Sequence, residues 1–164
     1  MINDIQNNLI KKESIFGPDN YKPLPVVLSR AKGVWAWDVN EKKYLDMMSG
    51  YSAVSHGHAH PELLRVFHEQ SSKLSLTSRA FYTDTLGPYL ETITKISGFE
   101  MCLPMNSGAE AVETAIKSSR RWAYRTKKVE PGKAEIIVAE GNFHGRTTTI
   151  ISFSTDENSR HDFG

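Results

Sequence analysis

The sequence has little cysteine, little net charge and no long hydrophobic run, and each shortage excludes a class of protein. Cys102 is the one cysteine among 164 residues, so an internal disulfide is impossible and a reducing compartment is expected. The net charge of +1 gives no electrostatic reason to expect nucleic acid or an anionic membrane as a partner. No segment approaches the roughly 18 apolar residues that span a bilayer. The N-terminus lacks the apolar core of a signal peptide, so we expect the cytoplasm.

The first half of the chain predicts a helical arm, a small antiparallel sheet and two helices. The first dozen residues have apolar positions at helical spacing, and a loop with three prolines follows at 16–25. Runs rich in β-branched and aromatic residues, separated by short turns, predict three strands. Pro61 opens a helix with an apolar stripe, and Gly98 ends another. The predicted strands are 26–30, 33–39 and 43–48, and the predicted helices are 61–74 and 87–97.

The second half of the chain predicts a strand–helix–strand unit. M-C-L-P-M at 101–105 and E-I-I-V-A-E at 135–140 are short apolar runs on either side of a helical pattern. This order is typical of a parallel sheet with a right-handed crossover, although Pro104 lacks the amide that a central strand donates. Two strands do not make a viable covered sheet. We therefore expect the chain to be the N-terminal portion of a longer protein.

The start of the helix near residue 107 has two interpretations. Ser107 and Glu110 form the S-x-x-E pattern of a capping box, which accounts for the helix without any ligand. Gly108 is not explained by capping, because glycine in a first helical turn costs roughly 0.5–1 kcal/mol relative to alanine. The amides of the first helical positions also point outward, where they suit a phosphate. From these residues alone, both interpretations stay open.

The loop E-G-N-F-H-G-R-T-T-T at 140–149 is a second candidate site. It follows a predicted strand, and ligands of open α/β sheets lie outside the carboxyl ends of the strands. It should therefore face the same place as the start of the 107 helix. Phe143, His144 and Arg146 suit a flat, charged ligand. The alternative is a polar loop with one aromatic side chain tucked into the core.

The histidines of H-G-H-A-H-P at 56–61 raise the question of a metal site. Three alternating histidines in one loop rarely converge on a tetrahedral centre, and no carboxylate or thiol nearby in the sequence completes a ligand set. We expect no metal. His60, beside Pro61, is interpreted as part of the helix start.

Taken together, these motifs resemble the coenzyme-binding half of class III aminotransferases, which are pyridoxal-phosphate enzymes of fold type I. The resemblance rests on N-S-G-A-E-A-V-E-T-A-I-K and G-N-F-H-G-R-T, and extends to the N-Y-K-P-L-P, S-G-Y-S-A-V-S-H-G-H-A-H-P and L-T-S-R-A-F-Y segments. It covers the chain from about residue 21 onward and is strongest with the ornithine branch of the family. It implies an α/β fold, with an arm and small-domain sheet in 1–50 and the start of the large coenzyme-binding domain in 51–164.

The resemblance also implies roles for individual residues. Ser107, Gly108 and Ala109 would hold the phosphate of pyridoxal 5′-phosphate. Phe143 would stack on the coenzyme ring, with His144 flanking it. Tyr21, Tyr51 and Arg146 would bind the substrate. No lysine here lies in a matching motif, so the catalytic lysine is expected downstream, and the chain alone is expected to be inactive.

The implied reaction transfers the δ-amino group of ornithine to 2-oxoglutarate, giving glutamate semialdehyde and glutamate. Such enzymes are homodimers of arginine and proline metabolism. The alternative within the family is an acetylornithine or other ω-amino-acid aminotransferase, which Tyr21 and Tyr51 argue against. The alternative outside it is a non-catalytic phosphate-binding α/β regulatory or scaffold fragment.

Overall fold

The computed structural model describes residues 2–163 and divides into two compact units, which meet in the sequence between Phe81 and Tyr82. Among the described residues, no helix is both long and apolar enough to cross a membrane.

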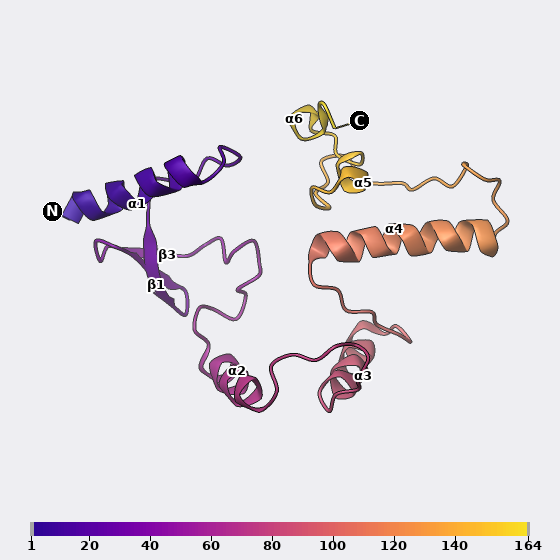
Figure 1. Cartoon of the computed structure of the whole chain (residues 1–164), viewed down its shortest axis with the longest axis horizontal. Coiled ribbons are helices and arrows are strands. Elements are labelled where there is room, and N and C mark those ends of the chain that lie inside the picture. Colours follow the sequence, from indigo (N-terminus) through magenta and orange to yellow (C-terminus); the bar gives the residue numbers. More distant parts are fainter. Residues whose placement is uncertain (1, 164) are drawn as a thin grey trace. The chain divides into compact units, whose positions relative to one another are not determined.

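The first unit contains a helical arm, a three-stranded sheet and one further helix (Figure 1). The strands lie in the order β1–β2–β3 and both neighbouring pairs are antiparallel, as the sequence predicts. The first strand has the expected length but begins two residues later than predicted. The second and third strands are shorter than expected, because the turns that join them take up the ends of the predicted runs. Their bounds are α1 Ile2–Phe16, β1 Leu28–Lys32, β2 Trp35–Asp38, β3 Lys43–Leu45 and α2 Pro61–Lys73.

The central strand β2 contains the buried residues of this sheet. It also carries two tryptophan side chains, each with a charged side chain over its ring. Ala36 and Asp38 are buried, at 3% exposure each. The ammonium of Lys43 lies 3.8 Å from the centroid of the Trp35 ring, and the guanidinium of Arg30 lies 4.0 Å from that of Trp37. Charged side chains from both neighbouring strands therefore cover the aromatic rings of β2 and hold them against the sheet.

Asp38 closes the turn between β2 and β3. One carboxylate oxygen accepts the backbone amides of Asn40 and Lys42, and the other accepts the Tyr44 hydroxyl at 2.8 Å. Burial raises the pKa of Asp38, but these hydrogen bonds outweigh it and leave the pKa below its ordinary value. The charged carboxylate is thus part of the turn.

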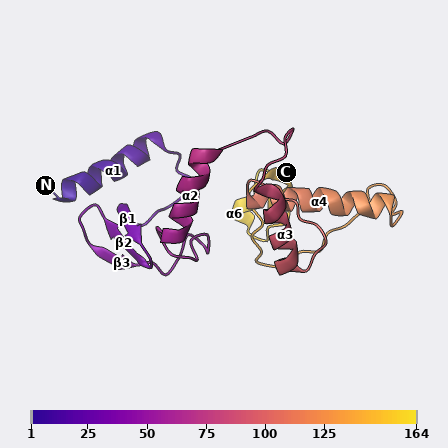
Figure 2. The same ribbon diagram turned by 90° about the horizontal axis from the view of Figure 1, so that it is seen from below.

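The arm α1 lies beside the three-stranded sheet of the same unit (Figure 2), and the side chain of Gln6 links it to the loops around that sheet. Gln6 donates to the carbonyl of Pro25 at 3.0 Å and accepts from the side-chain amide of Asn40 at the same distance. Both partners are far from Gln6 in the sequence, so the arm is a folded element and the predicted helix at the N-terminus is confirmed.

The second unit consists of four helices joined by long connections. Gly98 ends α3 in a left-handed conformation, as predicted. Its buried core is small and comes from two helices: Ile116 of α4 packs in the same unit as Ile150 and Ile151 of α5. The helices are α3 Leu86–Ser97, α4 Gly108–Arg125, α5 Thr148–Ile151 and α6 Glu157–Arg160.

The strands predicted at 101–105 and 135–140 do not form within the described residues. A strand needs a neighbour to accept and donate its backbone hydrogen bonds, and no described residue pairs with either segment. Their apolar side chains are accordingly exposed, and Cys102, predicted to lie in a buried strand, is half-buried. The local pattern was that of a strand, but its partners are not in the described chain.

Candidate functional site

The start of α4 is a capped helix end with open space beside it. Ser107 is the N-cap, and its hydroxyl accepts the backbone amide of Glu110 at 3.2 Å, which confirms the predicted cap. The Glu110 carboxylate accepts from the Ser107 hydroxyl and the Asn106 side chain, instead of reaching back to a backbone amide. The amides of Gly108 and Ala109 have no partner among the described residues.

Nothing in the described chain explains Gly108. A Cβ added there would meet no heavy atom within 4 Å. The glycine is therefore not required by packing inside this unit, while two outward amides and the positive end of the helix dipole lie beside it. This is the chemistry of an anion site at a helix N-terminus.

The 141–146 loop lies against this helix start, as the sequence predicts. A Cβ at Gly145, whose φ is +126°, would lie 3.1 Å from the Cβ of Ala109 and 3.3 Å from Ile150 Cδ1. The Thr147 hydroxyl also donates to the Glu113 carboxylate. Figure 1 shows the same proximity between α5 and the N-terminal end of α4. Two segments about 35 residues apart thus form one surface.

Asn142 organises this loop, a role that the sequence analysis missed. Its side-chain NH₂ donates to the carbonyls of Ala139, at 2.5 Å, and Phe153, at 3.0 Å. Because the NH₂ group of Asn142 points to these two carbonyls, its carbonyl oxygen points to His144. This oxygen lies 2.7 Å from Nδ1 of His144 and accepts a hydrogen bond from it. The ring of His144 is half-buried, with its centroid 6.1 Å from that of Phe153 in an edge-to-face contact.

Phe143 and Arg146 project from the loop that Asn142 and Gly145 hold. Phe143 is 75% exposed, so it is not tucked into the core of the described residues. The guanidinium of Arg146 lies 5.6 Å from the centroid of the Phe143 ring. A flat apolar face and a planar cation therefore lie side by side near the two outward amides of α4.

The first unit brings together Tyr21 and Tyr51, which are 30 residues apart. Their hydroxyls lie 2.7 Å from each other. Each tyrosine thus has its polar end fixed, while most of its ring is exposed. The five residues assigned to coenzyme binding lie in the second unit, and so does Arg146. The two tyrosines lie in the first unit.

Tyr51 sits in an unusual stretch of backbone. Ser49, Gly50, Tyr51 and Ser52 have φ angles of 49°, 55°, 55° and 73°, all in the left-handed region. Only glycine adopts this region without a steric cost. Asp46 precedes the stretch, and one of its carboxylate oxygens accepts the amides of Met48 and Ser49, both at 2.9 Å.

The other Asp46 oxygen lies 2.7 Å from Nε2 of His58. The His58 hydrogen bond lowers the pKa of Asp46 below its ordinary value, and the amides of Ser49 and Met48 add to this effect. The sequence analysis found no carboxylate for the histidine loop. Asp46 is such a carboxylate, placed there by the fold and engaged by His58.

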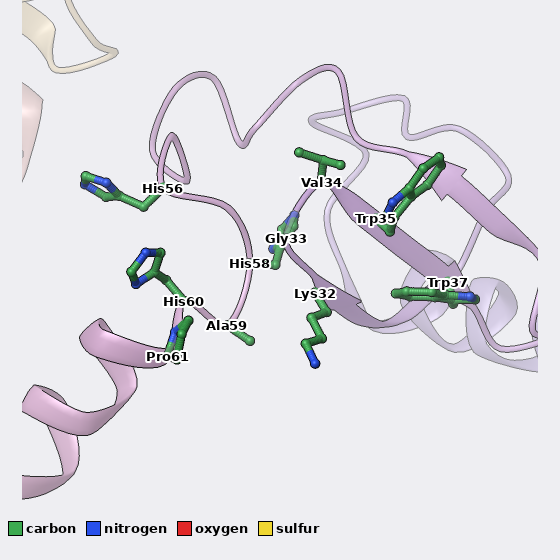
Figure 3. A pocket seen from close by; sticks show the side chains of 10 residues that line it. All are labelled: Lys32, Gly33, Val34, Trp35, Trp37, His56, His58, Ala59, His60 and Pro61. Atoms are coloured by element: carbon green, nitrogen blue, oxygen red, sulfur yellow. The ribbon is translucent and has the colours of Figure 1, made fainter.

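The three histidines of the 56–60 loop do not converge (Figure 3). They line an open pocket of about 560 Å³ together with Trp35 and Trp37. The rings of His56 and His60 lie edge to face at 6.3 Å, whereas His58 lies beside Gly33. In the part of the chain that the structure describes, no group of three or more His, Cys, Asp or Glu side chains is placed to hold a metal.

The sequence profile described as Aminotransferase class-III matches residues 16–164. The chain belongs to the class III aminotransferase family. It is 55% identical over 158 residues to an ornithine aminotransferase of Brevibacillus brevis, covering 96% of this chain and 40% of that protein. It is 53% identical to the ornithine aminotransferase of Halalkalibacterium halodurans, covering 95% of this chain and 39% of the relative.

Solved structures of class III aminotransferases share the fold of this chain. The ornithine aminotransferase of Toxoplasma gondii superposes with a TM-score of 0.94 at 38% identity, over 97% of this chain and 37% of that one. An acetylornithine aminotransferase from Elizabethkingia anophelis is more similar in sequence, at 55% identity, with a TM-score of 0.80 over 93% of this chain and 38% of that one. The chain thus spans about 40% of the length of the curated relatives it matches. These likenesses show fold type I, as the sequence predicts.

Proposed function

We propose that this chain is the N-terminal portion of a pyridoxal-phosphate-dependent ornithine aminotransferase. The observation that carries the proposal is the surface formed by the start of α4 and the 141–146 loop. It offers two unpaired amides, an exposed aromatic face and a guanidinium within one small region. We call the longer protein that this proposal implies the full-length enzyme.

The residues present fit the coenzyme. The amides of Gly108 and Ala109, with the Ser107 cap, would hold its phosphate, and the open space at Gly108 leaves room for it. Phe143 would lie against one face of the ring, and His144, fixed by Asn142, would flank it. When bound, the coenzyme supplies an electron sink for the bonds at the reacting carbon. The chain contributes binding and orientation, and a lysine beyond residue 164 would move the proton.

Three residues are proposed to bind the substrate, Arg146 in the second unit and Tyr21 and Tyr51 in the first. A planar guanidinium binds a carboxylate in a bidentate manner, and a tyrosine hydroxyl donates a further hydrogen bond. Presenting the δ-amino group of ornithine to the coenzyme requires that the α-carboxylate be held away from it. Tyr21 would donate to that carboxylate, Tyr51 would close over the aliphatic chain, and Arg146 would bind a substrate carboxylate. The products are glutamate semialdehyde and, from 2-oxoglutarate, glutamate.

The second candidate is an acetylornithine aminotransferase, favoured by the 55% identity to the Elizabethkingia enzyme. The hydroxyl contact between Tyr21 and Tyr51 supports ornithine instead, because two tyrosine side chains held together would leave little room for an acetyl group on the α-nitrogen of a substrate bound beside them. The proposal also includes a homodimer, a cytoplasmic location and no nucleic-acid or membrane partner. It keeps a functional boundary near residue 50 between the arm with its sheet and the coenzyme-binding domain.

Gly108→Val in the full-length enzyme tests the coenzyme site. We expect weaker coenzyme binding in a titration, with an unchanged circular dichroism spectrum, because a Cβ at this position meets no described atom within 4 Å and the valine side chain would fill the space beside the amides. Gly87→Val is the matched control: Gly87 also lies in a first helical turn with open space around it. Unchanged coenzyme affinity in folded Gly108→Val would sink the assignment.

Tyr21→Phe tests the amino donor. The variant loses a hydrogen bond to a charged group, which is worth roughly 1.5–3 kcal/mol, or about ten- to a hundredfold in kcat/KM for ornithine. A monoamine without an α-carboxylate should be affected far less. Equal losses on both substrates, or a parent enzyme that prefers acetylornithine, would favour the second candidate.

A further inference from the structure

Four consecutive residues in the left-handed region need an explanation, because three of them are not glycine. Ser49, Tyr51 and Ser52 each carry a Cβ, and the left-handed helical conformation costs roughly 1–2 kcal/mol per such residue. Backbone strain of this kind persists only where the surrounding structure fixes it, and it clusters at functional sites. The run holds Tyr51, a proposed substrate residue.

The Asp46 carboxylate fixes the start of this run. It accepts the amides of Met48 and Ser49, so the chain must turn around it immediately after β3. Two further bonds continue the turn: the Tyr51 amide donates to Met48 and the Val54 amide to Ser49, at 3.0 and 2.9 Å. The carboxylate is therefore the first anchor of a continuous hydrogen-bonded stretch.

His58 fixes the other end of the same stretch. Its backbone forms a two-way bridge with Gly33, at 2.8 and 2.9 Å, and its ring reaches Asp46. Gly57 packs so closely on Gly33 that a Cβ would lie 3.1 Å from the Gly33 Cα. The hydrogen bond between His58 and Asp46 thus joins the two ends of the 46–58 segment at one point on the sheet.

We propose that Asp46 and His58 are positioning residues that hold the left-handed turn so that the Tyr51 hydroxyl meets that of Tyr21. This inference rests on the proposed function, because it makes the pair determine amino-donor selectivity through Tyr51. Neither side chain touches the substrate. Their effect is to fix where the Tyr51 ring stands and so how much room is left beside the α-nitrogen.

The test compares kcat/KM for ornithine and for acetylornithine in the full-length enzyme. Asp46→Ala should lower the ratio of ornithine to acetylornithine by about tenfold, the size of one lost hydrogen bond to a charged group. In a Tyr51→Ala background the same change should leave the ratio unaltered, because the residue through which Asp46 acts is gone. Asp46→Asn keeps an oxygen that can accept the two amides. Its ratio should therefore lie between that of Asp46→Ala and that of the parent.

Asp38→Ala is the matched control. Asp38 also accepts two backbone amides in a turn of this sheet, but that turn carries no proposed site residue. It should lower stability and leave the ratio near that of the parent. The inference is overturned if Asp46→Ala and Asp38→Ala change the ratio equally, or if the Asp46→Ala effect persists without Tyr51.

Failure of the proposed function would look different, because the parent would then turn over neither substrate. In that case a crystal structure of Asp46→Ala or His58→Gln decides the inference. We expect positive φ angles to be lost in residues 49–52 and the two tyrosine hydroxyls to separate. An unchanged turn and an intact hydroxyl contact in both variants would overturn it.

Discussion

Three short polar side chains each hold a turn that local backbone preference does not determine. Asp38 closes the hairpin between β2 and β3, Asp46 starts the left-handed run, and Asn142 fixes the 141–146 loop. All three use their oxygen or amide atoms on backbone groups nearby in the sequence. The sequence analysis identified none of them, because an Asp or Asn in a loop is common and its partners become visible only once the backbone is placed. The residues that it did single out in these loops, Phe143 and Tyr51, are presented by such anchors.

The lowered pKa of Asp46 predicts that the free energy of unfolding depends on pH. Because its folded-state pKa lies below the ordinary value of 3.8, the folded state holds fewer protons than the unfolded state in that range. The stabilisation that the charged Asp46 carboxylate contributes is complete when the pH is above its ordinary pKa. It disappears as the pH falls through the lowered pKa of the folded state. Asp46→Asn in the full-length enzyme should therefore be less stable at neutral pH and approach the parent in acid. Denaturant unfolding at a series of pH values between neutral and acid measures this.

Asp19→Asn is the control for this experiment. Asp19 is exposed and makes no hydrogen bond among the described residues, so its variant should follow the parent at every pH. Some acid dependence will remain in Asp46→Asn, because Asp38 and Asp156 also have lowered pKa values. If the free energies of unfolding of Asp46→Asn and the parent differ by the same amount at every pH down to acid, the charge of the Asp46 carboxylate does not stabilise the fold.

Among the elements, those with local signals were predicted well. Pro61 at the start of α2, Gly98 after α3 and the Ser107 cap of α4 act within one helical turn, so the sequence alone locates these ends. The two strands predicted at 101–105 and 135–140 need pairing partners elsewhere, and neither strand forms in the part of the chain that the structure describes. The left-handed run was also missed. Gly50 is its one residue with a local preference for that conformation, and the other three are held there by contacts.

The contact between the 141–146 loop and α4 gives a prediction at this scale. Gly145→Ala should lower the free energy of unfolding by roughly 1–3 kcal/mol, because the methyl group meets Ala109 at 3.1 Å and the backbone is left-handed. Gly132→Ala isolates the backbone part, since Gly132 has φ +83° and open space around it. Thermal unfolding without coenzyme measures both.

A second substitution checks the cause. Ala109→Gly in the Gly145→Ala background removes the carbon that the new methyl group meets, so it should recover part of the lost stability. The interpretation fails if Gly145→Ala is no more destabilising than Gly132→Ala, or if Ala109→Gly recovers nothing. Either result would mean that the loop and the helix start do not constrain each other.

Over the whole chain, large apolar side chains are widely exposed in both units. Leu76 is 89% exposed and Ile137 98%, and Phe16, Met47, Met101 and Leu103 are also largely open. The fully apolar core of the described residues is correspondingly small. Large apolar side chains that are this widely exposed favour association with another part of an assembly that covers them.

The 164-residue chain in isolation should therefore bind a hydrophobic dye and associate. We expect a rise in anilinonaphthalene sulfonate fluorescence and species larger than a monomer in size-exclusion chromatography. The full-length enzyme, at equal concentration, should bind little dye. A monodisperse monomer of the isolated chain without dye binding would show that its exposed apolar residues are tolerated in water.

The cations stacked on the indoles of β2 have a spectroscopic consequence. Trp35 and Trp37 lie under Lys43 and Arg30 in the first unit, whereas Trp122, the third tryptophan, belongs to α4 in the second. A positive charge over an indole shifts its emission, and unfolding of the sheet removes that charge. Trp122→Phe would leave a fluorescence signal from residues 1–81 alone, and the double change at Trp35 and Trp37 would leave one from 82–164. The two halves of the chain thus carry separate optical reporters, and the order in which they melt becomes measurable.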